Sequence, residues 1–161
     1  MWECELPFEK YPDLDGVKDL VQKYEDDAGY DLQAFGILEC PCLPDDIPET
    51  RYKSLLLQSL KSYKMFCGIR VNIPANYMGL IVPRSSFRNQ GLICQAIWDA
   101  GYTGWVMPFV TTSGMDIEIE SGSRVLQLII FPKPKVISRH IFFDTLPKTL
   151  RGDRGVGSTG K

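Results

Sequence analysis

The stretch Arg124-Val-Leu-Gln-Leu-Ile-Ile-Phe131, followed by Pro132-Lys-Pro134, decides the fold class of this chain. Its residues are mostly apolar, as in a buried strand, and prolines cannot continue a ladder of backbone hydrogen bonds. The segment before it, Asp116-Ile-Glu-Ile-Glu120, alternates polar and apolar residues, which is typical of a strand with one face in solvent. Ser121-Gly122 marks a turn between the two. The sequence therefore predicts two consecutive strands here.

Short apolar runs of the same kind recur along the chain, separated by turn signals such as Pro74-Ala-Asn76. Several short strands with regular turns indicate an all-β fold, a sandwich, barrel or jelly-roll-like arrangement. A weak helical pattern is found only over Asp15–Asp26. There is no internal repeat or interdomain linker, so we predict a single β domain over residues 1–150 and a separate tail over 151–161. The further apolar runs are Met65–Ile73, Gly79–Val82, Gly91–Trp98 and Gly104–Thr111.

Composition is that of an ordinary globular protein. The 161 residues are enough for one domain with a real core, and 44% are hydrophobic and 24% charged. A net charge of −2 gives no global basic field, so we expect no nucleic-acid partner. No apolar run is long enough to span a membrane, and the N-terminus Met1-Trp-Glu-Cys-Glu does not resemble a signal peptide. We therefore expect a cytoplasmic protein, or one of the nucleus or host cell if its source is eukaryotic or viral.

The cysteines and the histidine exclude several kinds of site. Five cysteines, an odd number, indicate reduced thiols in an intracellular chain. Cys40-x-Cys42 is half of a metal-binding spacing, but no second pair follows, so structural zinc is not expected. The single histidine, His140, lies in the strand-like run Ile137–Phe143. A Ser-His-Asp or Cys-His mechanism is therefore excluded.

The segment Arg151-Gly-Asp-Arg-Gly-Val-Gly-Ser-Thr-Gly-Lys161 is glycine-rich and cationic. It has too few apolar residues to order itself by burial, so one interpretation is a disordered end. The other is a mobile tail that orders around phosphate groups, which glycine amides, hydroxyls and guanidinium groups bind well. Gly155–Lys161 matches the start of a P-loop, but no helix follows it, so a P-loop is not expected.

Five blocks of sequence stand out in order: Ala28–Leu32, Pro83–Ser86, Asp99–Gly104, Arg124–Leu128 and Arg151–Gly160. Together they resemble the five motifs of the trimeric dUTPases. Two features are most similar to those of an archaeal-type branch of the family, close to the dCTP deaminases. They are the sequence Ile97-Trp-Asp-Ala-Gly-Tyr102 and the short interval from Arg84 to Asp99. The resemblance implies a jelly-roll-like (β-clip) fold with little helix and a flexible C-terminal tail. It also implies Mg²⁺-dependent hydrolysis of dUTP to dUMP and diphosphate, which limits uracil in DNA and supplies dUMP for dTMP synthesis.

The third block carries the chemistry that the resemblance implies. Asp99 matches the aspartate that orients the attacking water and hydrogen-bonds the deoxyribose 3′-OH; the alternative is an aspartate in a β-turn. Tyr102 matches the tyrosine that packs under the sugar and leaves no space for a 2′-OH; the alternative is an ordinary strand aromatic. The base would be read by the hairpin Ile93–Ile97, with Gln95 where many family members have asparagine.

Phosphate binding is assigned by the same resemblance to Arg84, Ser85, Ser86 and Gln127. A glutamine between two leucines in a buried strand needs a partner in any case, so a core role for Gln127 competes evenly. Arg124 is better assigned to structure, pairing with a carboxylate. Mg²⁺ would be held by the three phosphates and by water, with no direct protein ligand. Asp31 matches the aspartate near the metal-bound waters and the subunit contact.

The resemblance also assigns roles in the tail. Arg151 matches the arginine that reaches the γ-phosphate, and Val156 stands where most family members have a phenylalanine that stacks on uracil. Loss of that stack costs about 1–3 kcal/mol per base, so closure should depend more on phosphate contacts. Asp153 is a second departure, because an acid disfavours a nearby triphosphate. The residues that would close over the phosphates are Gly157, Ser158 and Thr159.

Three alternatives remain open. A dCTP deaminase, alone or bifunctional, needs a glutamate on the strand after Gly104, which here carries no carboxylate unless the alignment shifts to Glu118 or Glu120. A nucleotide-gated regulatory protein on the same scaffold would keep the same motifs. A plain structural β domain would leave the five ordered blocks unexplained. The resemblance implies a homotrimer, with sites at subunit interfaces and the tail of one chain covering the site of another.

Overall fold

The computed structural model of this protein describes residues 5–22, 24, 27–43 and 45–140. Strands dominate this part of the chain, with one short helix among them. The elements, in chain order, are β1 Phe8–Lys10, β2 Tyr30–Gln33, β3 Gly36–Glu39, β4 Ser54–Leu57, β5 Ser62–Phe66, β6 Ile69–Val71, β7 Tyr77–Pro83, α1 Ser85–Asn89, β8 Leu92–Ile93, β9 Ala96–Trp98, β10 Phe109–Thr112, β11 Ile117–Glu120 and β12 Arg124–Pro132.

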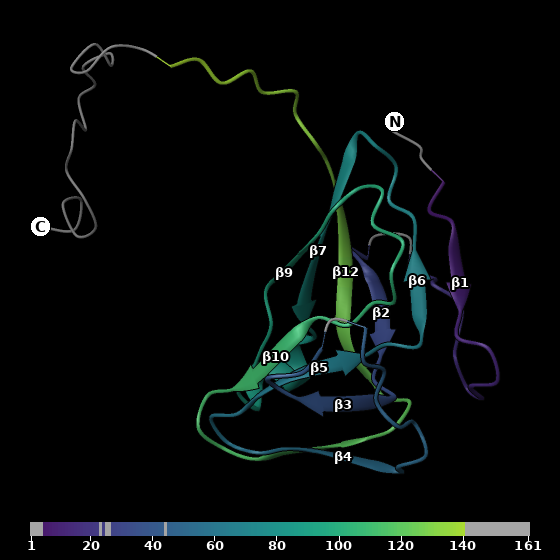
Figure 1. The fold of residues 1–161 in the computed structure, drawn as a ribbon, viewed down its shortest axis with the longest axis vertical. Helices are drawn as coiled ribbons and strands as arrows, with labels where there is room; N and C mark the ends of the chain where they lie inside the picture. Colours follow the sequence, from purple (N-terminus) through teal and green to yellow (C-terminus); the bar gives the residue numbers. More distant parts are fainter. Residues whose placement is uncertain (1–4, 23, 25–26, 44, 141–161) are drawn as a thin grey trace, which may run out of the picture.

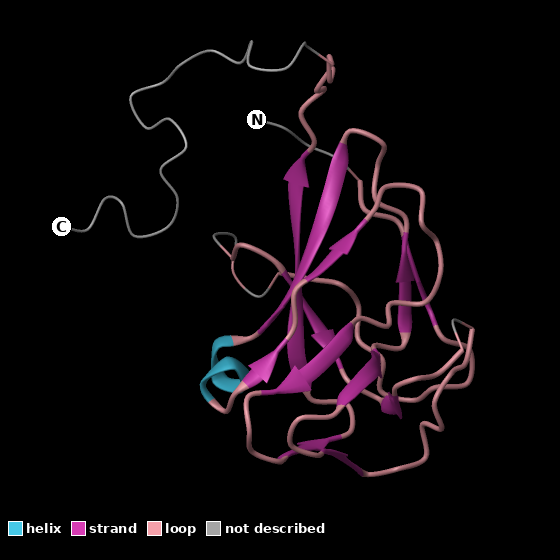
Figure 2. Ribbon diagram, turned by 60° about the vertical axis from the view of Figure 1, so that its left-hand side comes forward, coloured by secondary structure: helices cyan, strands magenta, loops and turns pink. Residues whose placement is uncertain are grey.

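Two four-stranded sheets form the body of the molecule, in the orders β2-β12-β7-β9 and β3-β5-β10-β8. In Figure 1 the strands of the second sheet run across those of the first. Two small sheets flank them: β1-β6 lies along one side, and β11-β4 lies at the base. Figure 2 shows the helix α1 beside the strands rather than covering a sheet face. The all-β, jelly-roll-like fold expected from the sequence is confirmed.

Strand β12 is the central element of the first sheet. It pairs antiparallel with β7 from Leu126 opposite Pro83 to Pro132 opposite Tyr77, and on its other edge with β2. Leu126 and Leu128 are fully buried. The prediction of a buried strand ended by prolines is therefore confirmed. Strands β7 and β12 form the frame from which the candidate site residues project.

Three predicted strands are divided or shortened in the structure. The run Gly91–Trp98 forms two short strands, β8 and β9. The run Met65–Ile73 is interrupted at Gly68, whose φ of 69° is in the left-handed region that favours glycine. The run Gly104–Thr111 becomes a strand only at Phe109. Before that point the Val106 amide donates to the Ile69 carbonyl at 2.8 Å, so this stretch follows the edge of β6 instead.

The helix expected over Asp15–Asp26 is wrong, because the described residues of this stretch are not helical. Gly16 has a φ of 83°, and the Lys18 amide donates to the Gln33 side-chain oxygen at 2.8 Å. The Gln33 amide group donates to the Gly16 carbonyl at 3.2 Å and to the Gly122 carbonyl at 2.7 Å. This buried glutamine therefore ties the N-terminal segment to the β11–β12 turn and takes the backbone partners that a helix would need.

Replacing Gln33 with leucine should lower the free energy of unfolding by about 1–3 kcal/mol, because it removes three part-buried hydrogen bonds, to the Lys18 amide and to the Gly16 and Gly122 carbonyls. Urea denaturation measures the change. Gln58→Leu, at an exposed position, is the matched control and should stay near the parent protein. Equal stability of the two variants would show that the hydrogen bonds of Gln33 to the N-terminal segment and to the β11–β12 turn do not stabilise the fold.

The stretch Asp45–Ser62 supplies β4. This strand pairs with β11, with Ile117 opposite Leu57 and Ile119 opposite Leu55, and all four side chains are buried. The stretch thus closes the base of the core. Within the described ranges, no helix has the length and apolar character needed to cross a membrane.

Candidate active site

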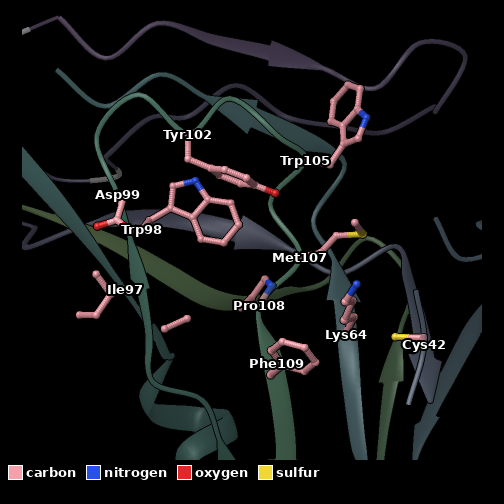
Figure 3. A pocket seen from close by; sticks show the side chains of 11 residues that line it. Cys42, Lys64, Ile97, Trp98, Asp99, Tyr102, Trp105, Met107, Pro108 and Phe109 are labelled. Carbon is pink, nitrogen blue, oxygen red and sulfur yellow. The ribbon is translucent and has the colours of Figure 1, made fainter. Parts of the chain in front are cut away.

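Six of the predicted site residues, Asp31, Arg84, Ser85, Asp99, Tyr102 and Gln127, line one or the other of two pockets. We call the first the hairpin pocket; it has a volume of about 510 Å³ and contains Asp99 and Tyr102. We call the second the arginine pocket; it has a volume of about 330 Å³. The hairpin pocket (Figure 3) is lined by Cys42, Lys64, Ala96, Ile97, Trp98, Asp99, Tyr102, Trp105, Met107, Pro108 and Phe109. The arginine pocket is lined by Tyr24, Asp27, Ala28, Gly29, Asp31, Arg84, Ser85, Arg88 and Gln127.

The Tyr102 ring is held in place by its neighbours. Strand β9 pairs with β7, which puts Trp98 opposite Gly79, and the chain then turns through Gly101, whose φ is 79°. The Tyr102 and Trp98 rings meet edge to face, with centroids 5.0 Å apart and an interplanar angle of 80°. A Cβ atom at Gly104 would collide with the Tyr102 hydroxyl and ring. The ring is thus fixed between Trp98 and the backbone of Gly104.

Gly104→Ala should therefore displace the Tyr102 ring and raise the KM for dUTP, the substrate that the sequence resemblance implies. The effect on kcat should be smaller, because Asp99 keeps its place. Steady-state kinetics measures both constants, and Thr103→Ala, at an exposed neighbouring position, is the control. An unchanged KM in Gly104→Ala would show that the position of this ring does not matter for substrate binding.

Asp99 is exposed at the end of the hairpin. Its backbone carbonyl accepts a hydrogen bond from the Tyr102 amide at 3.3 Å, so Asp99 begins a turn. That position in a turn is compatible with a role of the Asp99 side chain in the site. Within the described part of the chain, no hydrogen bond or ion pair occupies its side chain, and Asp99 is the only carboxylate among the described residues that line the hairpin pocket. The carboxylate is therefore available to accept a proton from a bound water.

The far wall of the hairpin pocket was not predicted. Trp105 packs edge to face against Tyr11, with ring centroids 5.0 Å apart, and the Arg70 guanidinium lies 5.2 Å from its ring. Lys64 is buried, with Nζ donating to the Leu43 carbonyl at 2.8 Å and lying 5.9 Å from the Phe109 ring. These residues come from β5, β10 and the β6 edge, so no local sequence signal points to them.

In the arginine pocket, Asp31 binds two guanidinium groups. Arg84 Nε lies 3.0 Å from Asp31 Oδ1, and an Arg124 terminal nitrogen lies 3.4 Å from Asp31 Oδ2. Arg84 also donates to the Arg124 carbonyl at 3.3 Å. The prediction that Arg124 pairs with a carboxylate is confirmed. Asp31 thus orients the Arg84 side chain, which is 38% exposed and faces solvent in the pocket.

Of the other three predicted phosphate-binding residues, Ser85 and Gln127 line the arginine pocket and Ser86 does not. Ser85 begins α1 and lines the arginine pocket, whereas Ser86 is exposed and does not. Gln127 is half-buried, stands opposite Asp31 in the β2–β12 register and lines the pocket, so it does not serve the core alone. Arg88, one turn of α1 beyond Arg84, also lines the pocket. The spacing of four residues between Arg84 and Arg88, about one helical turn, was the signal that could have revealed it.

Some predicted residues are not in either pocket. Gln95 is exposed in the turn between β8 and β9 and does not line the hairpin pocket, so its predicted contact with the base has no support from this geometry. His140 is exposed and outside any strand, so the strand-like reading of residues 137–140 is wrong. The predicted tail residues lie outside the described residues; they are Arg151, Val156, Gly157, Ser158 and Thr159.

One chain does not bring the two pockets together. Asp99 directly follows Trp98, which pairs with Gly79 near one end of β7, whereas Arg84 follows the other end of that strand. The five residues from Gly79 to Arg84 span roughly 16 Å at about 3.3 Å per residue. Among the described residues, none lines both pockets. Asp99 and Arg84 of the same chain are therefore too far apart to act on one phosphate group.

Comparisons with known proteins agree on one family. A family model described as dUTPase matches residues 52–160. The deoxyuridine 5′-triphosphate nucleotidohydrolase of Escherichia phage T5 is 33% identical over 143 residues, which cover 84% of this chain and 87% of that enzyme. The enzyme of the same name from Leifsonia xyli is 36% identical over 101 residues, covering 58% of this chain and 64% of that enzyme.

Solved structures show the same fold at low sequence identity. A mutant dUTPase of Staphylococcus bacteriophage 80alpha with dUpNHpp superposes with a TM-score of 0.73 at 19% identity, covering 98% of this chain and 99% of that one. A mutant dUTPase from phage phi11 of S. aureus, with a structural Mg(II) ion, gives a TM-score of 0.68 at 16% identity, covering 86% and 97%. Since the family model covers most of the sequence and the phage T5 enzyme matches across most of both chains, this chain belongs to the dUTPase family.

Proposed function

We propose that this protein hydrolyses dUTP to dUMP and diphosphate. The observation that carries the proposal is the hairpin pocket, in which the Asp99 carboxylate, without a partner among the described residues, lies on the same turn as the Tyr102 ring. The relatives at 33% and 36% identity are named for this activity, and the 80alpha enzyme that shares the fold was solved with the dUTP analogue dUpNHpp.

In this reaction Asp99 accepts a hydrogen bond from the water that attacks the α-phosphate and takes its proton. General-base assistance of this kind contributes about 10²–10⁴-fold to the rate. Tyr102, held by Trp98 and Gly104, supports the deoxyribose and excludes a 2′-OH sterically. Arg84, oriented by Asp31, supplies charge-assisted hydrogen bonds to the phosphates. Ser85 and Gln127 add neutral donors from the same pocket.

The separation of the two pockets supports a homotrimer with shared sites. A hairpin pocket on one subunit and an arginine pocket on another would bring base, sugar and phosphates to a single nucleotide. The resemblance places the tail of a further chain over the same site, with Arg151 at the γ-phosphate. Size-exclusion chromatography with light scattering tests the assembly, and a monomer with full activity would contradict it.

The described residues are compatible with a Mg²⁺ ion that is bound together with the substrate, by its phosphates. In the described part of the chain, no three His, Cys, Asp or Glu side chains gather as ligands, and the two Asp31 oxygens already face Arg84 and Arg124. An ion held by the three phosphates and by water needs no such cluster, because Mg²⁺ retains much of its hydration. When bound, it would neutralise phosphate charge. Asp31 and Gln127 are the residues placed to accept from or donate to its waters.

The activity is proposed for the cytoplasm, or for the nucleus or host cell, where it would limit uracil in DNA and supply dUMP. Placement in an archaeal-type branch stays a prediction, since the relatives reported above come from phages and a bacterium. A deaminase needs a glutamate in the hairpin pocket. Glu118 instead accepts from Ser54, and Glu120 lines a different pocket, so the shifted alignment gains no support.

Product analysis by anion-exchange chromatography tests the proposal. The protein is incubated with Mg²⁺ and either dUTP or dCTP, and we expect dUMP and diphosphate from dUTP only. Deaminated product from dCTP would favour the deaminase. Binding of dUTP without turnover would favour a regulatory protein on this scaffold.

A further inference from the structure

Two thiols that have no role in the proposed reaction are in contact beside the hairpin pocket. Cys40 Sγ and Cys42 Sγ are 3.7 Å apart, and both side chains are half-buried. The other two described cysteines, Cys67 and Cys94, are buried, and burial raises the pKa of Cys94 to about 12. An oxidant in solution can therefore reach the first pair far more easily than the second.

The fold holds these two thiols together. The Cys40 amide donates to the Ser62 carbonyl at 2.8 Å, at the start of β5. Just beyond Cys42, the Leu43 carbonyl accepts from Lys64 Nζ at 2.8 Å, and the Leu43 amide donates to Asp46 Oδ2 at 2.9 Å. Hydrogen bonds thus hold the backbone at Cys40 and at Leu43, on either side of the pair. The contact between the sulfurs is built into the structure rather than left to chance encounters.

The pair also has a direct connection to the hairpin pocket. Cys42 lines that pocket together with Lys64, Asp99 and Tyr102. In Figure 3 the Cys42 sulfur points toward the Lys64 side chain, which is only 7% exposed. Any movement of Cys42 will therefore shift the wall of the pocket and the carbonyl that holds Lys64.

We propose that Cys40 and Cys42 form a reversible dithiol–disulfide site, oxidised by hydroperoxides, that alters the hairpin pocket. The Cys42 thiolate attacks a peroxide oxygen, the O–O bond breaks, and a sulfenic acid and one molecule of water (or alcohol) are formed. Cys40 then attacks that sulfur and releases its oxygen as water. The pair loses two protons and two electrons, and the peroxide is reduced.

The order of these steps follows from the surroundings of each thiol. The pKa of Cys40 is raised, first by burial and then by the adjacent Cys42 thiol. Cys42 lines the hairpin pocket, from which a hydroperoxide can reach it, so it suits the first step. Cys40 then attacks, as its thiolate, the sulfenic acid that is already in contact with it. Closing the bond shortens the sulfur separation from 3.7 Å to about 2.0 Å. That change is the origin of the expected effect on the pocket.

The test is peptide mass mapping of the folded protein after treatment with hydrogen peroxide. A Cys4→Ser background removes the one cysteine outside the described residues. We expect the peptide containing Cys40 and Cys42 to lose the mass of two hydrogen atoms, and dithiothreitol to restore it. Cys67 and Cys94 should stay unmodified. Cys40→Ser should not lose the two hydrogens and should accumulate a sulfenic acid at Cys42. An unchanged peptide in the parent protein under excess peroxide would overturn the proposal.

A second measurement tests the connection to the pocket, which rests on the proposed function. The KM for dUTP should rise on oxidation and return with dithiothreitol, and Cys40→Ser should show no such reversible change. Disulfide formation with an unchanged KM would overturn the effect on the pocket. The mass readout does not require hydrolysis, so failure of the proposed dUTPase activity and failure of the thiol site can be told apart.

Discussion

Asp99→Asn is expected to lower kcat for dUTP hydrolysis by about 10²–10⁴-fold, the usual contribution of a positioned general base. Asparagine keeps the size and the hydrogen-bonding oxygen but cannot take a proton from water. Because Asp99 is exposed and its carboxylate has no partner among the described residues, folding should be unaffected. Initial rates of diphosphate release, measured at saturating dUTP, give the change in kcat.

The control for this variant is Asp19→Asn, which removes an exposed carboxylate paired with Lys10 at 2.7 Å on the N-terminal segment. It should hydrolyse dUTP at the parent rate. A binding measurement with a non-hydrolysable dUTP analogue should show that Asp99→Asn still binds. If the variant kept its full kcat, the base would have to be another group, and the role given to Asp99 would be wrong.

Arg84→Ala is expected to lower kcat/KM for dUTP by about 10–150-fold, since a hydrogen bond to a charged group contributes about 1.5–3 kcal/mol. The loss should include KM, because the guanidinium binds phosphate in the ground state as well as during reaction. Asp31 keeps its contact with Arg124, so its carboxylate is not left without a partner. The parent's KM should also rise more steeply with salt concentration than that of the variant.

Arg51→Ala is the matched control, because Arg51 is an exposed arginine whose ion pair with Glu49 lies away from both pockets. Arg84→Lys adds a further distinction. Lysine keeps the charge but not the paired donors of a guanidinium, so only part of the activity should return. Full activity of Arg84→Ala would remove the arginine pocket from the proposed site.

The elements most accurately predicted from the sequence were those with a strong local pattern. The alternation in Asp116–Glu120 became β11, and the apolar run Arg124–Phe131 became β12. The helix expected over Asp15–Asp26 failed because Gln33, on a distant strand, supplies the hydrogen bonds of that segment. Local propensity there was weak, and a tertiary contact decided the outcome.

In the candidate site, too, local motifs could be identified from the sequence, whereas residues brought in by tertiary contacts could not. The short motifs around Asp99, Tyr102 and Arg84 were identifiable because turns and loops carry their chemistry in consecutive residues. The base contact of Gln95 stays a prediction, because its side chain is exposed in the hairpin turn and does not line the hairpin pocket. Lys64 was not identified at all, since it is brought into the pocket by its place on β5.

Local patterns in the sequence were sufficient to predict most of the strands, the order of the motifs and hence the family. These follow from the two-residue period of strands and from turn chemistry, both of which act between near neighbours. Only the tertiary structure decided which motifs share a pocket: it joined Asp31 to Arg84 and Cys42 to Asp99, and it separated Asp99 from Arg84. The physical reason is that strands pair and sheets pack between residues far apart in the chain, where local patterns carry no information on distance.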